Sequence, residues 1–357
     1  MFYRSRVLEM LTQQLADRQS LSGPDVARAV EALTRPDVAA EMKAEFLTAL
    51  ARKGEVVSEI AAFARELRAK SLAPPLDAET RSRQILDVCG TGGDRLNTFN
   101  ISTTVALIVA SAGVTVAKHG NRAITSQAGS ADVLEALGIR IDLEPEEAAR
   151  GLREHHFAFF FAPKYHPAFR EIAPARKLCA ARGQRTIFNF LGPLLNPAHP
   201  AAQLIGVPRP ELCQPIAAVL QMLGARRGMV VSGAVLAGGV VCHLDELSTL
   251  GESCVAEFYQ ERGFCVSMLS PRNFPVQPSA LADLAGSDRQ ANAEIVRRLL
   301  RGEDRGPKRD AVLLNSAAAL FVAEKAASLT EGWELAGELM DSGRALGKLE
   351  QLARVWK

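Results

Sequence analysis

The stretch Asp87-Val-Cys-Gly-Thr-Gly-Gly-Asp94 constrains the fold more than any other part of this chain. Residues 85–89 have the length and β-branched content of a buried strand. Three glycines within four residues follow, and a polar segment then leads into an apolar run over residues 105–110. A strand, a glycine turn and a helix N-terminus together present backbone N–H groups to an anion. The stretch therefore favours an anion-binding loop, although an ordinary glycine-rich βα turn remains the alternative.

The chain before this loop shows only helical periodicity. Leu8, Leu11 and Leu15 recur at helical spacing, and Ser22-Gly-Pro-Asp25 is a helix start signal with proline in the first turn. Further apolar positions at helical spacing extend the pattern to residue 72. We expect about four helices here, followed by a polar, proline-bearing linker over residues 73–83.

From residue 85 onward, short apolar runs alternate with helical patterns. This alternation predicts an α/β domain with a mostly parallel central sheet, whose ligands bind at the C-terminal ends of the strands. We therefore expect a small helical domain over residues 1–75 and a larger α/β domain over residues 76–357. Further strands are predicted at 114–117, 139–143, 157–162 and 229–232, and helices at 131–137, 145–152, 291–300, 312–327 and 332–340.

Composition narrows the classes of partner. The net charge of +2, from 42 basic and 40 acidic residues, gives no general attraction to nucleic acid or to an anionic membrane. The charged loop 304–310 mixes both signs and is expected to be a solvated surface. The six cysteines show no metal-ligand spacing, and no signal peptide or membrane span is recognisable. We expect a soluble cytoplasmic protein.

A second polar segment, Lys118-His-Gly-Asn-Arg-Ala-Ile-Thr-Ser126, directly follows a predicted strand. It is rich in groups that donate hydrogen bonds to phosphate and ribose oxygens. The segment 127–132 then opens a helix with Ser130 at its cap, where an anion is also favoured. A polar loop without a ligand is the alternative, but the position after a neighbouring strand favours a shared site.

Asp245 and Glu246 are adjacent acids flanked by leucines. Neighbouring side chains on a regular strand face opposite sides, so both reach one site only from a loop or a strand end. Magnesium on a pyrophosphate is typically held by one or two carboxylates together with phosphate and water oxygens. The pair is thus either a magnesium site or a solvated acidic pair.

A third region presents groups suited to an aromatic acid. His166 lies in a turn between two prolines, where it either contacts such an acid or makes a structural hydrogen bond. Arg176 lies on the following predicted helix, where a guanidinium pairs with a carboxylate or simply faces solvent. Residues 185–197 mix apolar and turn residues and are interpreted as mainly structural.

Together these segments resemble the anthranilate phosphoribosyltransferase family almost from end to end. The resemblance is carried by five motifs in combination: Gly-Thr-Gly-Gly-Asp, Thr-Phe-Asn-Ile-Ser-Thr, Lys-His-Gly-Asn-Arg, Gly-Ser-Ala-Asp-Val-Leu-Glu-Ala-Leu-Gly and Leu-Asp-Glu-Leu-Ser. It implies a helical domain hinged to an α/β domain, with helices near residues 165–200 joining the helical part. It also implies a homodimer formed through that part, and no nucleic-acid or membrane partner.

The resemblance implies transfer of the phosphoribosyl group of phosphoribosyl pyrophosphate (PRPP) to the amine of anthranilate, with one or two Mg²⁺ ions. Ser102, Asp245 and Glu246 match the magnesium positions. Gly90, Asn121 and Arg176 match positions that contact anthranilate. The PRPP positions are Gly90, Gly93, Asp94, Thr98, Asn100, Ile101, Ser102, Thr103, Lys118, His119, Gly120, Asn121, Arg122, Ala123, Ile124, Thr125, Ser126 and Ser130.

Several positions depart from the family pattern. Thr125 stands where serine is usual, Gln127-Ala128 replaces Lys-Ser, and His243 occupies a common glycine position. The chain is also longer than usual near residues 179–184 and 233–242. Two alternatives are a pyrimidine nucleoside phosphorylase, which shares the fold but not these motifs, and a catalytically divergent paralogue that binds nucleic acid or another ligand.

Overall fold

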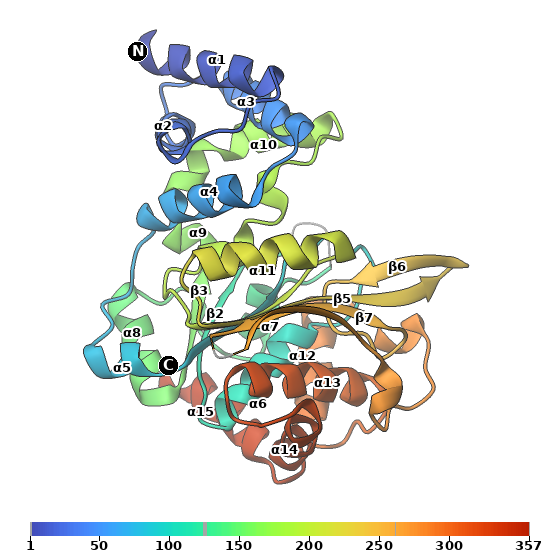
Figure 1. Cartoon of the computed structure of the whole chain (residues 1–357). Helices are drawn as coiled ribbons and strands as arrows, with labels where there is room; N and C mark the ends of the chain where they lie inside the picture. Colours follow the sequence, from blue (N-terminus) through green and yellow to red (C-terminus); the bar gives the residue numbers. More distant parts are fainter. Residues whose placement is uncertain (1, 124–126, 261, 357) are drawn as a thin grey trace.

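The computed structural model describes residues 2–123, 127–260 and 262–356. A stack of N-terminal helices stands on one side of a sheet, and most of the later helices cover the other side (Figure 1). The helices of the stack are α1 (Phe2–Ala16), α2 (Gly23–Leu33), α3 (Ala40–Lys53) and α4 (Val57–Ala69). They confirm the helical character predicted for the N-terminal segment.

Local sequence signals fix the ends of these helices. Ser22 caps α2, because its hydroxyl accepts from the Asp25 N–H while the Asp25 carboxylate accepts from the Ser22 N–H at 3.0 Å. Helix α3 ends at Gly54, whose φ of 88° suits a residue without a side chain. The start and stop signals visible in the sequence therefore act as expected.

The described residues form an eight-stranded sheet in the order β3-β2-β1-β4-β5-β7-β8, with β6 paired to β5. The five strands from β3 to β5 run parallel, and β6, β7 and β8 pair antiparallel. The mostly parallel sheet is confirmed. The strands are β1 (Ile85–Gly90), β2 (Thr115–Gly120), β3 (Phe157–Phe161), β4 (Ala202–Gly206), β5 (Arg227–Ala237), β6 (Val240–Leu244), β7 (Ser253–Tyr259) and β8 (Gly263–Leu269).

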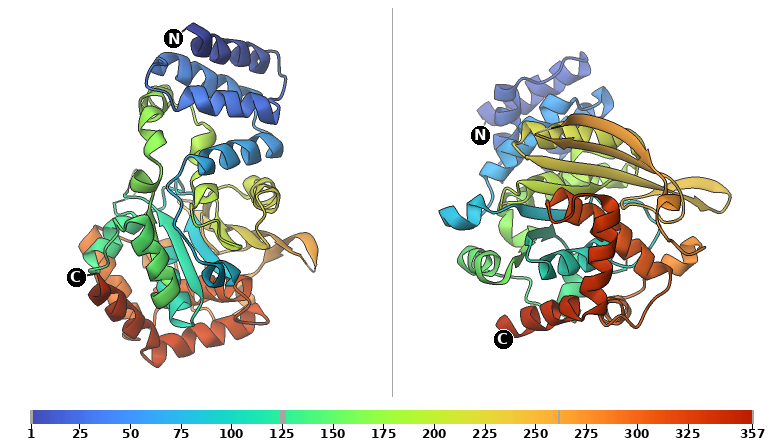
Figure 2. Two further views of the ribbon diagram at one scale, coloured as in Figure 1. Left: turned by 90° about the vertical axis from the view of Figure 1, so that its left-hand side faces the viewer. Right: turned by 60° about the horizontal axis from the view of Figure 1, so that its bottom comes forward.

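Helices cover both faces of this sheet (Figures 1 and 2). Helix α11 lies on the face toward the N-terminal stack, and α6, α12, α13 and α14 lie below the opposite face. The helices after α4 are α5 (Ala78–Ser82), α6 (Ile101–Ser111), α7 (Ser130–Ala136), α8 (Pro145–His155), α9 (Ala162–Tyr165), α10 (Ala173–Ala181), α11 (Cys213–Met222), α12 (Arg289–Leu300), α13 (Pro307–Val322), α14 (Leu329–Asp341) and α15 (Arg344–Val355). Short 3₁₀ turns connect several of them.

The hydrophobic core of the N-terminal stack includes residues from later in the chain. Ile172, Cys179 and Ile187 are buried together with the apolar faces of α1 to α4, and Lys43 of α3 donates to the Glu171 carbonyl at 2.9 Å. The same core continues through α4 to α11 and one face of the sheet. The division at residue 75, with helices near 165–200 joining the first domain, stays a prediction that this packing supports.

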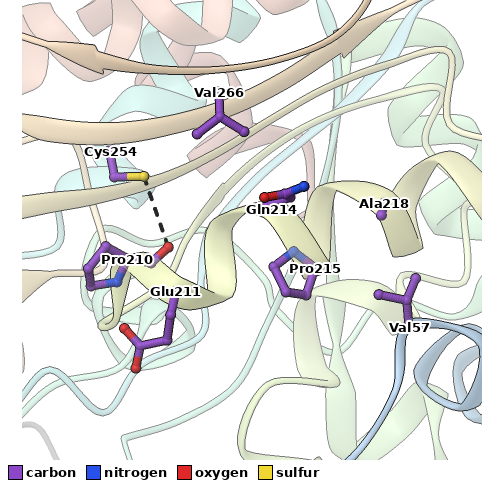
Figure 3. A pocket seen from close by; sticks show the side chains of 8 residues that line it. All are labelled: Val57, Pro210, Glu211, Gln214, Pro215, Ala218, Cys254 and Val266. Atoms are coloured by element: carbon purple, nitrogen blue, oxygen red, sulfur yellow. Dashed lines mark hydrogen bonds between the residues drawn. The ribbon is translucent and has the colours of Figure 1, made fainter.

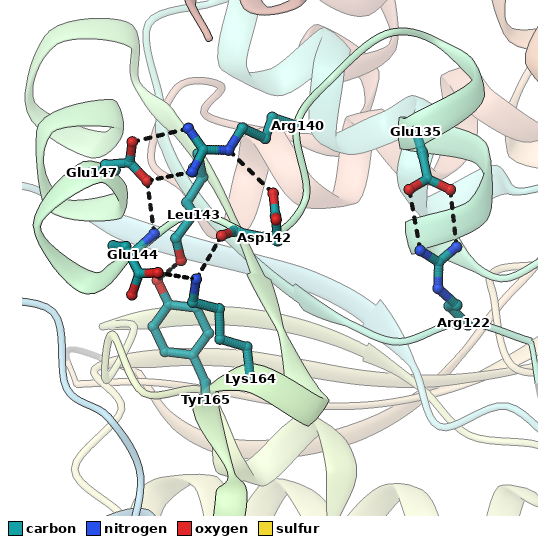
Figure 4. A network of polar contacts seen from close by, with 9 residues as sticks. All are labelled: Arg122, Glu135, Arg140, Asp142, Leu143, Glu144, Glu147, Lys164 and Tyr165. Carbon is teal, nitrogen blue, oxygen red and sulfur yellow. Dashed lines mark hydrogen bonds and ion pairs between the residues drawn. The ribbon is translucent and has the colours of Figure 1, made fainter.

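The strand predicted at residues 139–143 is wrong. Ile139, Ile141 and Leu143 alternate into the core as strand residues do, but the segment pairs with no strand among the described residues. Side chains take the place of a partner strand: Tyr165 Oη donates to the Leu143 carbonyl at 3.0 Å, and Lys164 Nζ donates to the Asp142 carbonyl at 2.7 Å (Figure 4). Alternating hydrophobicity reports one buried face and does not reveal whether a strand lies alongside.

The longer region at residues 233–242 is the β5–β6 hairpin, which projects beyond the sheet at the right of Figure 1. Strands β4, β6, β7 and β8 and helices α5, α9, α11 and α15 were not predicted from the sequence, and α5 lies within the segment expected to be a linker. Among the described residues, no helix is long and apolar enough to cross a bilayer.

Candidate active site

The candidate site begins where three parallel strands end side by side. Gly90, the last residue of β1, pairs with Gly206, the last residue of β4, while β2 ends at Gly120 on the other side of β1. The chain then turns through Gly92 and Gly93, whose φ angles of 75° and 87° favour glycine. This loop leads into the N-terminus of α6, so the predicted arrangement of strand, glycine turn and helix is confirmed.

The acidic pair lies against this loop, although it is far away in the sequence. Asp245 and Glu246 follow the end of β6. The Asp245 Oδ2 atom accepts from the Gly92 N–H at 2.6 Å, and the Glu246 Oε1 atom accepts from the Ser102 N–H in the first turn of α6 at 3.1 Å. The structure therefore brings the glycine loop, the helix N-terminus and both acids into one site.

Glycines on three strands make room for the acidic pair. A Cβ atom at Gly90 would overlap the Asp245 carboxylate, and a Cβ atom at Gly206 would overlap the Asp245 carbonyl. A Cβ atom at Gly233 of β5 would lie 2.5 Å from the Glu246 carbonyl oxygen. The loop that carries both acids can lie this close to the sheet because the strands have glycine at these three positions.

The surroundings of Asp245 and Glu246 do not supply enough positive charge to keep both carboxylates at their ordinary pKa. Burial, together with a smaller contribution from the Asp245 charge, raises the pKa of Glu246 to about 8, while Lys118 opposes the shift. Burial also raises the pKa of Asp245 to about 7, with a smaller contribution from the Asp94 charge. A bound cation would relieve both effects, because an opposite charge favours the ionised carboxylate.

The donor set fits magnesium bound together with a phosphate ligand. The described residues contain no cluster of three or more His, Cys, Asp or Glu side chains that could hold a metal ion alone. Two carboxylates and the Ser102 hydroxyl are nevertheless hard oxygen donors, and Mg²⁺ commonly completes its shell with water and substrate phosphate oxygens. The site therefore suits a metal that arrives with its substrate.

Lys118 provides the counter-charge in the floor of the site. Its side chain is buried, and its Nζ atom donates to the Val88 carbonyl at 2.7 Å and contacts Ser102 Oγ at 3.4 Å. Burial lowers the pKa of Lys118, against the attraction of Glu246. On α6, the buried Thr103 hydroxyl has no hydrogen-bond partner among the described residues.

Asn100 and neighbouring residues connect the loop to other elements. Asn100 does not cap α6 with its side chain; its Nδ2 atom donates to the Ala128 carbonyl at 3.1 Å and its Oδ1 atom accepts from Asn292 at 2.9 Å. Thr98 forms an isolated bridge with Ala285, and Ile101 is buried. These contacts hold the entrance to α6 in place.

The second polar loop is tied to α7. The Asp132 carboxylate accepts from the Ala123 N–H at 3.0 Å, and Ser130 Oγ donates to the Asn121 carbonyl at 3.3 Å. Arg122 pairs with Asp132 at 2.9 Å and Glu135 at 3.0 Å, as Figure 4 shows for Glu135. Arg122 is therefore engaged within the protein. Ile124, Thr125 and Ser126 lie outside the described residues.

His119 points away from Lys118, as its neighbour on a strand should. Its Nε2 atom lies 3.2 Å from His166 Nε2, and its Nδ1 atom lies 3.2 Å from the Gly192 carbonyl oxygen. Burial lowers the pKa of His119 to about 3 and that of His166 to about 4, so both rings are neutral at pH 7. Of the two alternatives for His166, the structure shows the structural hydrogen bond.

A chain of aromatic contacts leads from this histidine pair to Arg176. The His166 ring stacks on Phe169 with centroids 5.3 Å apart, and Phe169 meets Phe188 edge-on at 5.6 Å. The Arg176 guanidinium lies 5.5 Å from the centroid of Phe188. Arg176 has no ion-pair partner among the described residues, and burial lowers its pKa. A partly buried cation beside aromatic rings suits an aromatic carboxylate.

A pocket of about 340 Å³ lies elsewhere, between α4, α11 and strands β7 and β8 (Figure 3). It is lined by residues such as Val57, Pro215 and Val266, and Cys254 contacts the Pro210 carbonyl beside it. None of the residues predicted for the site lines this pocket. The candidate site is therefore identified from the polar contacts among its residues and not from this pocket.

Sequence reasoning missed the residues that support the acidic pair. Gly206 and Gly233 carry no motif of their own, and Asn315 lies in an apolar helical run. Asn315 binds both backbone groups of Leu247, the residue after Glu246. A lone amide in the interior of an otherwise apolar helix was the only signal that pointed to it, since a buried polar group requires partners.

Comparisons with known proteins agree with this arrangement. A family model described as "Glycosyl transferase family, a/b domain" matches residues 82–346, and one described as "Glycosyl transferase family, helical bundle domain" matches residues 10–71. The chain is 42% identical over 350 residues to an anthranilate phosphoribosyltransferase of Alkaliphilus metalliredigens (strain QYMF), covering 98% of each chain.

Two solved structures are similar over nearly the whole chain. The first is anthranilate phosphoribosyltransferase from Thermus thermophilus, with a TM-score of 0.85 and 40% identity, covering 96% of this chain and 98% of that one. The second is the Saccharomyces cerevisiae enzyme in complex with PRPP and Mg, with a TM-score of 0.84 and 28% identity, covering 97% of this chain and 96% of that one.

Proposed function

The chain belongs to the anthranilate phosphoribosyltransferase family, and we propose that its site performs that family's reaction. The enzyme transfers the 5-phosphoribosyl group of PRPP to the amine of anthranilate. The products are N-(5-phosphoribosyl)anthranilate and pyrophosphate, in a step of tryptophan biosynthesis. The observation that supports this best is the contact of Asp245 and Glu246 with the glycine loop and the first turn of α6.

PRPP is proposed to bind across the ends of β1 and β2. The N–H groups of the glycine loop and of the first turn of α6 suit its phosphate oxygens, and Lys118 supplies positive charge beneath them. Thr103 offers a hydroxyl with no other partner among the described residues. Asn121 and Ser130 border the ribose side, at the end of β2 and the start of α7. Gly90 lies where the two substrates meet.

Ser102, Asp245 and Glu246 are proposed to hold one or two Mg²⁺ ions together with the pyrophosphate of PRPP. Bound magnesium supplies positive charge that stabilises the leaving pyrophosphate. The chain's own contribution is to keep two carboxylates buried and ionisable beside the helix N-terminus, so that the metal and its phosphate partner bind together.

The reaction needs positioning and charge stabilisation rather than a protein nucleophile. The bond from C1 of the ribose to pyrophosphate breaks while the anthranilate amine attacks C1, through a transition state with oxocarbenium character. Backbone N–H groups and Lys118 stabilise the departing negative charge. The amine loses its proton during or after bond formation, so no strong general base is required. The neutral His119 and His166 rings are consistent with a positioning role.

Anthranilate is proposed to lie along the aromatic contacts between the histidine pair and Arg176. Its carboxylate would pair with the Arg176 guanidinium, which has no acidic partner among the described residues, and Asn121 would contact it at the PRPP end. Arg176 comes from α10, which packs on α3 of the N-terminal stack. The two substrates would therefore be held by different parts of the molecule, which suits a hinge between them. We also propose a homodimer formed through the helical part.

The direct test follows the fluorescence of anthranilate with purified protein, PRPP and Mg²⁺. We expect fluorescent anthranilate to be consumed only when PRPP and Mg²⁺ are both present. Unchanged anthranilate with both substrates and the metal would rule the proposal out. Salt-sensitive DNA binding in such an inactive protein would support the divergent paralogue, which the near-neutral net charge of +2 disfavours.

A further inference from the structure

The loop that carries the acidic pair has no regular secondary structure, yet every residue from 245 to 248 is anchored. Asp245 accepts from the Gly92 N–H and Glu246 from the Ser102 N–H, which are the contacts already described. The Ser248 N–H donates to the buried Ser253 hydroxyl at 3.0 Å. Leu247 is held by Asn315, whose hydrogen bonds go to neither the glycine loop nor the N-terminus of α6.

Asn315 holds Leu247 at two points. Its Oδ1 atom accepts from the Leu247 N–H at 2.9 Å, and its Nδ2 atom donates to the Leu247 carbonyl at 3.0 Å. The second proton of Nδ2 goes to the Ala311 carbonyl, one helical turn earlier, at 2.9 Å. The side chain is 0% exposed. Two hydrogen bonds to the same residue fix the orientation of its backbone as well as its position.

The opposite side of the loop is equally restricted. A Cβ atom at Gly206 would overlap the Asp245 carbonyl, and one at Gly233 would lie 2.5 Å from the Glu246 carbonyl oxygen. The loop is thus pressed between the sheet and α13, and Leu247 itself is 1% exposed. A shift in the Leu247 backbone would therefore move the Glu246 carboxylate rather than be absorbed elsewhere.

Helix α13 is a rigid base for this contact. Twelve of its residues besides Asn315 are buried, and it packs directly on α6, whose first turn donates the Ser102 N–H to Glu246. Helix α13 therefore supports both elements that meet at the Glu246 carboxylate. Through Asn315 it holds the loop that carries Glu246, and by packing it holds α6, whose first turn binds the carboxylate.

We propose that Asn315 is a positioning residue that sets the Asp245–Glu246 loop for binding of PRPP with Mg²⁺. This inference rests on the proposed function. Asn315 touches neither substrate nor metal and acts through the Leu247 backbone alone. Residues that orient metal ligands in this way typically change metal affinity by about 10–100-fold when they are replaced.

The test is calorimetric titration of PRPP in the presence of Mg²⁺ and without anthranilate, so that no turnover occurs. Asn315→Leu keeps the branched shape of the side chain but leaves the Leu247 N–H and carbonyl without partners. We expect its affinity for PRPP with Mg²⁺ to fall about 10-fold or more. In turnover assays the KM for PRPP should rise, the KM for anthranilate should stay unchanged, and added Mg²⁺ should restore part of the lost rate.

Ser316→Ala is the matched control. Ser316 is the next residue on α13, is equally buried, and its hydroxyl has no hydrogen-bond partner among the described residues. It should bind PRPP with Mg²⁺ as the unmodified protein does. If Asn315→Leu fails to fold, as judged by circular dichroism, Asn315→Ala removes the same hydrogen bonds without adding volume, and its affinity for PRPP with Mg²⁺ should fall in the same direction.

The outcomes separate the two proposals. An unmodified protein that does not bind PRPP with Mg²⁺ would refute the proposed function. An unmodified protein that binds, with a folded Asn315 variant that binds equally well, would overturn the positioning role alone. Equal rises in the KM values for both substrates would also overturn it, since they would indicate a general loss of structure.

Discussion

At the scale of single residues, the site brings together ionisable groups that are shielded from water. Lys118 is buried and Asp245 and Glu246 are half-buried beside the glycine loop, and removal from water shifts the pKa of each toward its neutral form. Lys118 cannot balance two carboxylates. The ligand-free site is therefore less stable than an apolar one would be, and the missing positive charge is what a magnesium-bound substrate brings.

The shifted pKa of Glu246 predicts how stability depends on pH. The native pKa is raised to about 8 from its ordinary value of 4.5, so the native carboxyl stays protonated where the unfolded one has ionised. The stability contributed by Glu246 is complete below pH 4.5 and is lost as the pH rises to about 8. Glu246→Gln cannot ionise, so its free energy of unfolding should improve relative to the unmodified protein across this range.

Chemical denaturation at several pH values, without PRPP or Mg²⁺, measures this difference. Histidines such as His119 contribute a pH dependence of their own, with the opposite sign, because their native pKa is lowered. That contribution is common to both proteins and cancels in the comparison. Parallel stability curves for Glu246→Gln and the unmodified protein would contradict the prediction.

Arg176 carries the second residue-scale prediction. Arg176→Ala should raise the KM for anthranilate by about 10-fold or more, since a charged hydrogen-bonded pair contributes about 1.5–3 kcal/mol, and should leave the KM for PRPP nearly unchanged. Steady-state kinetics with each substrate varied in turn measures both constants. Lys177→Ala, at the neighbouring position on α10, is the control. An equal effect of the two substitutions would remove Arg176 from the anthranilate site.

At the scale of elements, the local motifs were predictable and their partners were not. The glycine loop, the helix α7 and the positive φ of Gly138 follow from residue types within a few positions, and the sequence indicated them. The predicted cap of α7 was wrong by one residue: Gly129 is the N-cap, and the Ser130 hydroxyl donates to the Asn121 carbonyl instead. The extended segment at 139–143 looks like a strand because Tyr165 and Lys164 satisfy its carbonyls from another part of the chain. Strand pairing depends on two segments of the chain, so the pattern of one segment cannot reveal whether it pairs.

The same reason explains the residues that were missed. Gly206 looks like any glycine at a strand end until the Asp245 carbonyl is seen against it. Asn315 resembles a helix residue until its contact with Leu247, 68 positions away, is known. The residues proposed to meet substrate were found because a family resemblance supplied the distant contacts. The residues that support them carry no such motif.

Gly206→Ala tests the role of these glycines. A Cβ atom there would overlap the Asp245 backbone, which has no free space to move into. We expect the free energy of unfolding to fall by about 1–3 kcal/mol and the affinity for PRPP with Mg²⁺ to fall with it. Gly347→Ala in α15 is the control, because nothing lies within 4 Å of the added atom; it should stabilise by about 0.5–1 kcal/mol. Denaturant unfolding measures whether the free energy of unfolding falls for Gly206→Ala and rises for Gly347→Ala.

At the scale of the whole molecule, the residues proposed to bind PRPP and those proposed to bind anthranilate belong to different layers of the fold. The residues proposed for PRPP lie on strand ends and on the helices below the sheet, whereas Arg176 lies on α10, beside the N-terminal stack (Figure 1). A buried core runs from that stack through α4 to α11 and the sheet. The two parts of the molecule are therefore connected by packed elements and not by a linker alone.

The final prediction concerns the stability of the whole protein with its ligands. PRPP with Mg²⁺ at about 100 times its dissociation constant should stabilise the native state by about 2.7 kcal/mol, which a thermal melt detects. PRPP in the presence of a chelator should give a much smaller shift, because its pyrophosphate would then face Asp245 and Glu246 without a cation between them. Above about pH 8, where the Glu246 carboxylate is ionised, Glu246→Gln should narrow the gap between the two conditions, since it removes one of the repelling charges. Equal shifts with and without Mg²⁺ in the unmodified protein would show that the Asp245 and Glu246 carboxylates do not face the pyrophosphate.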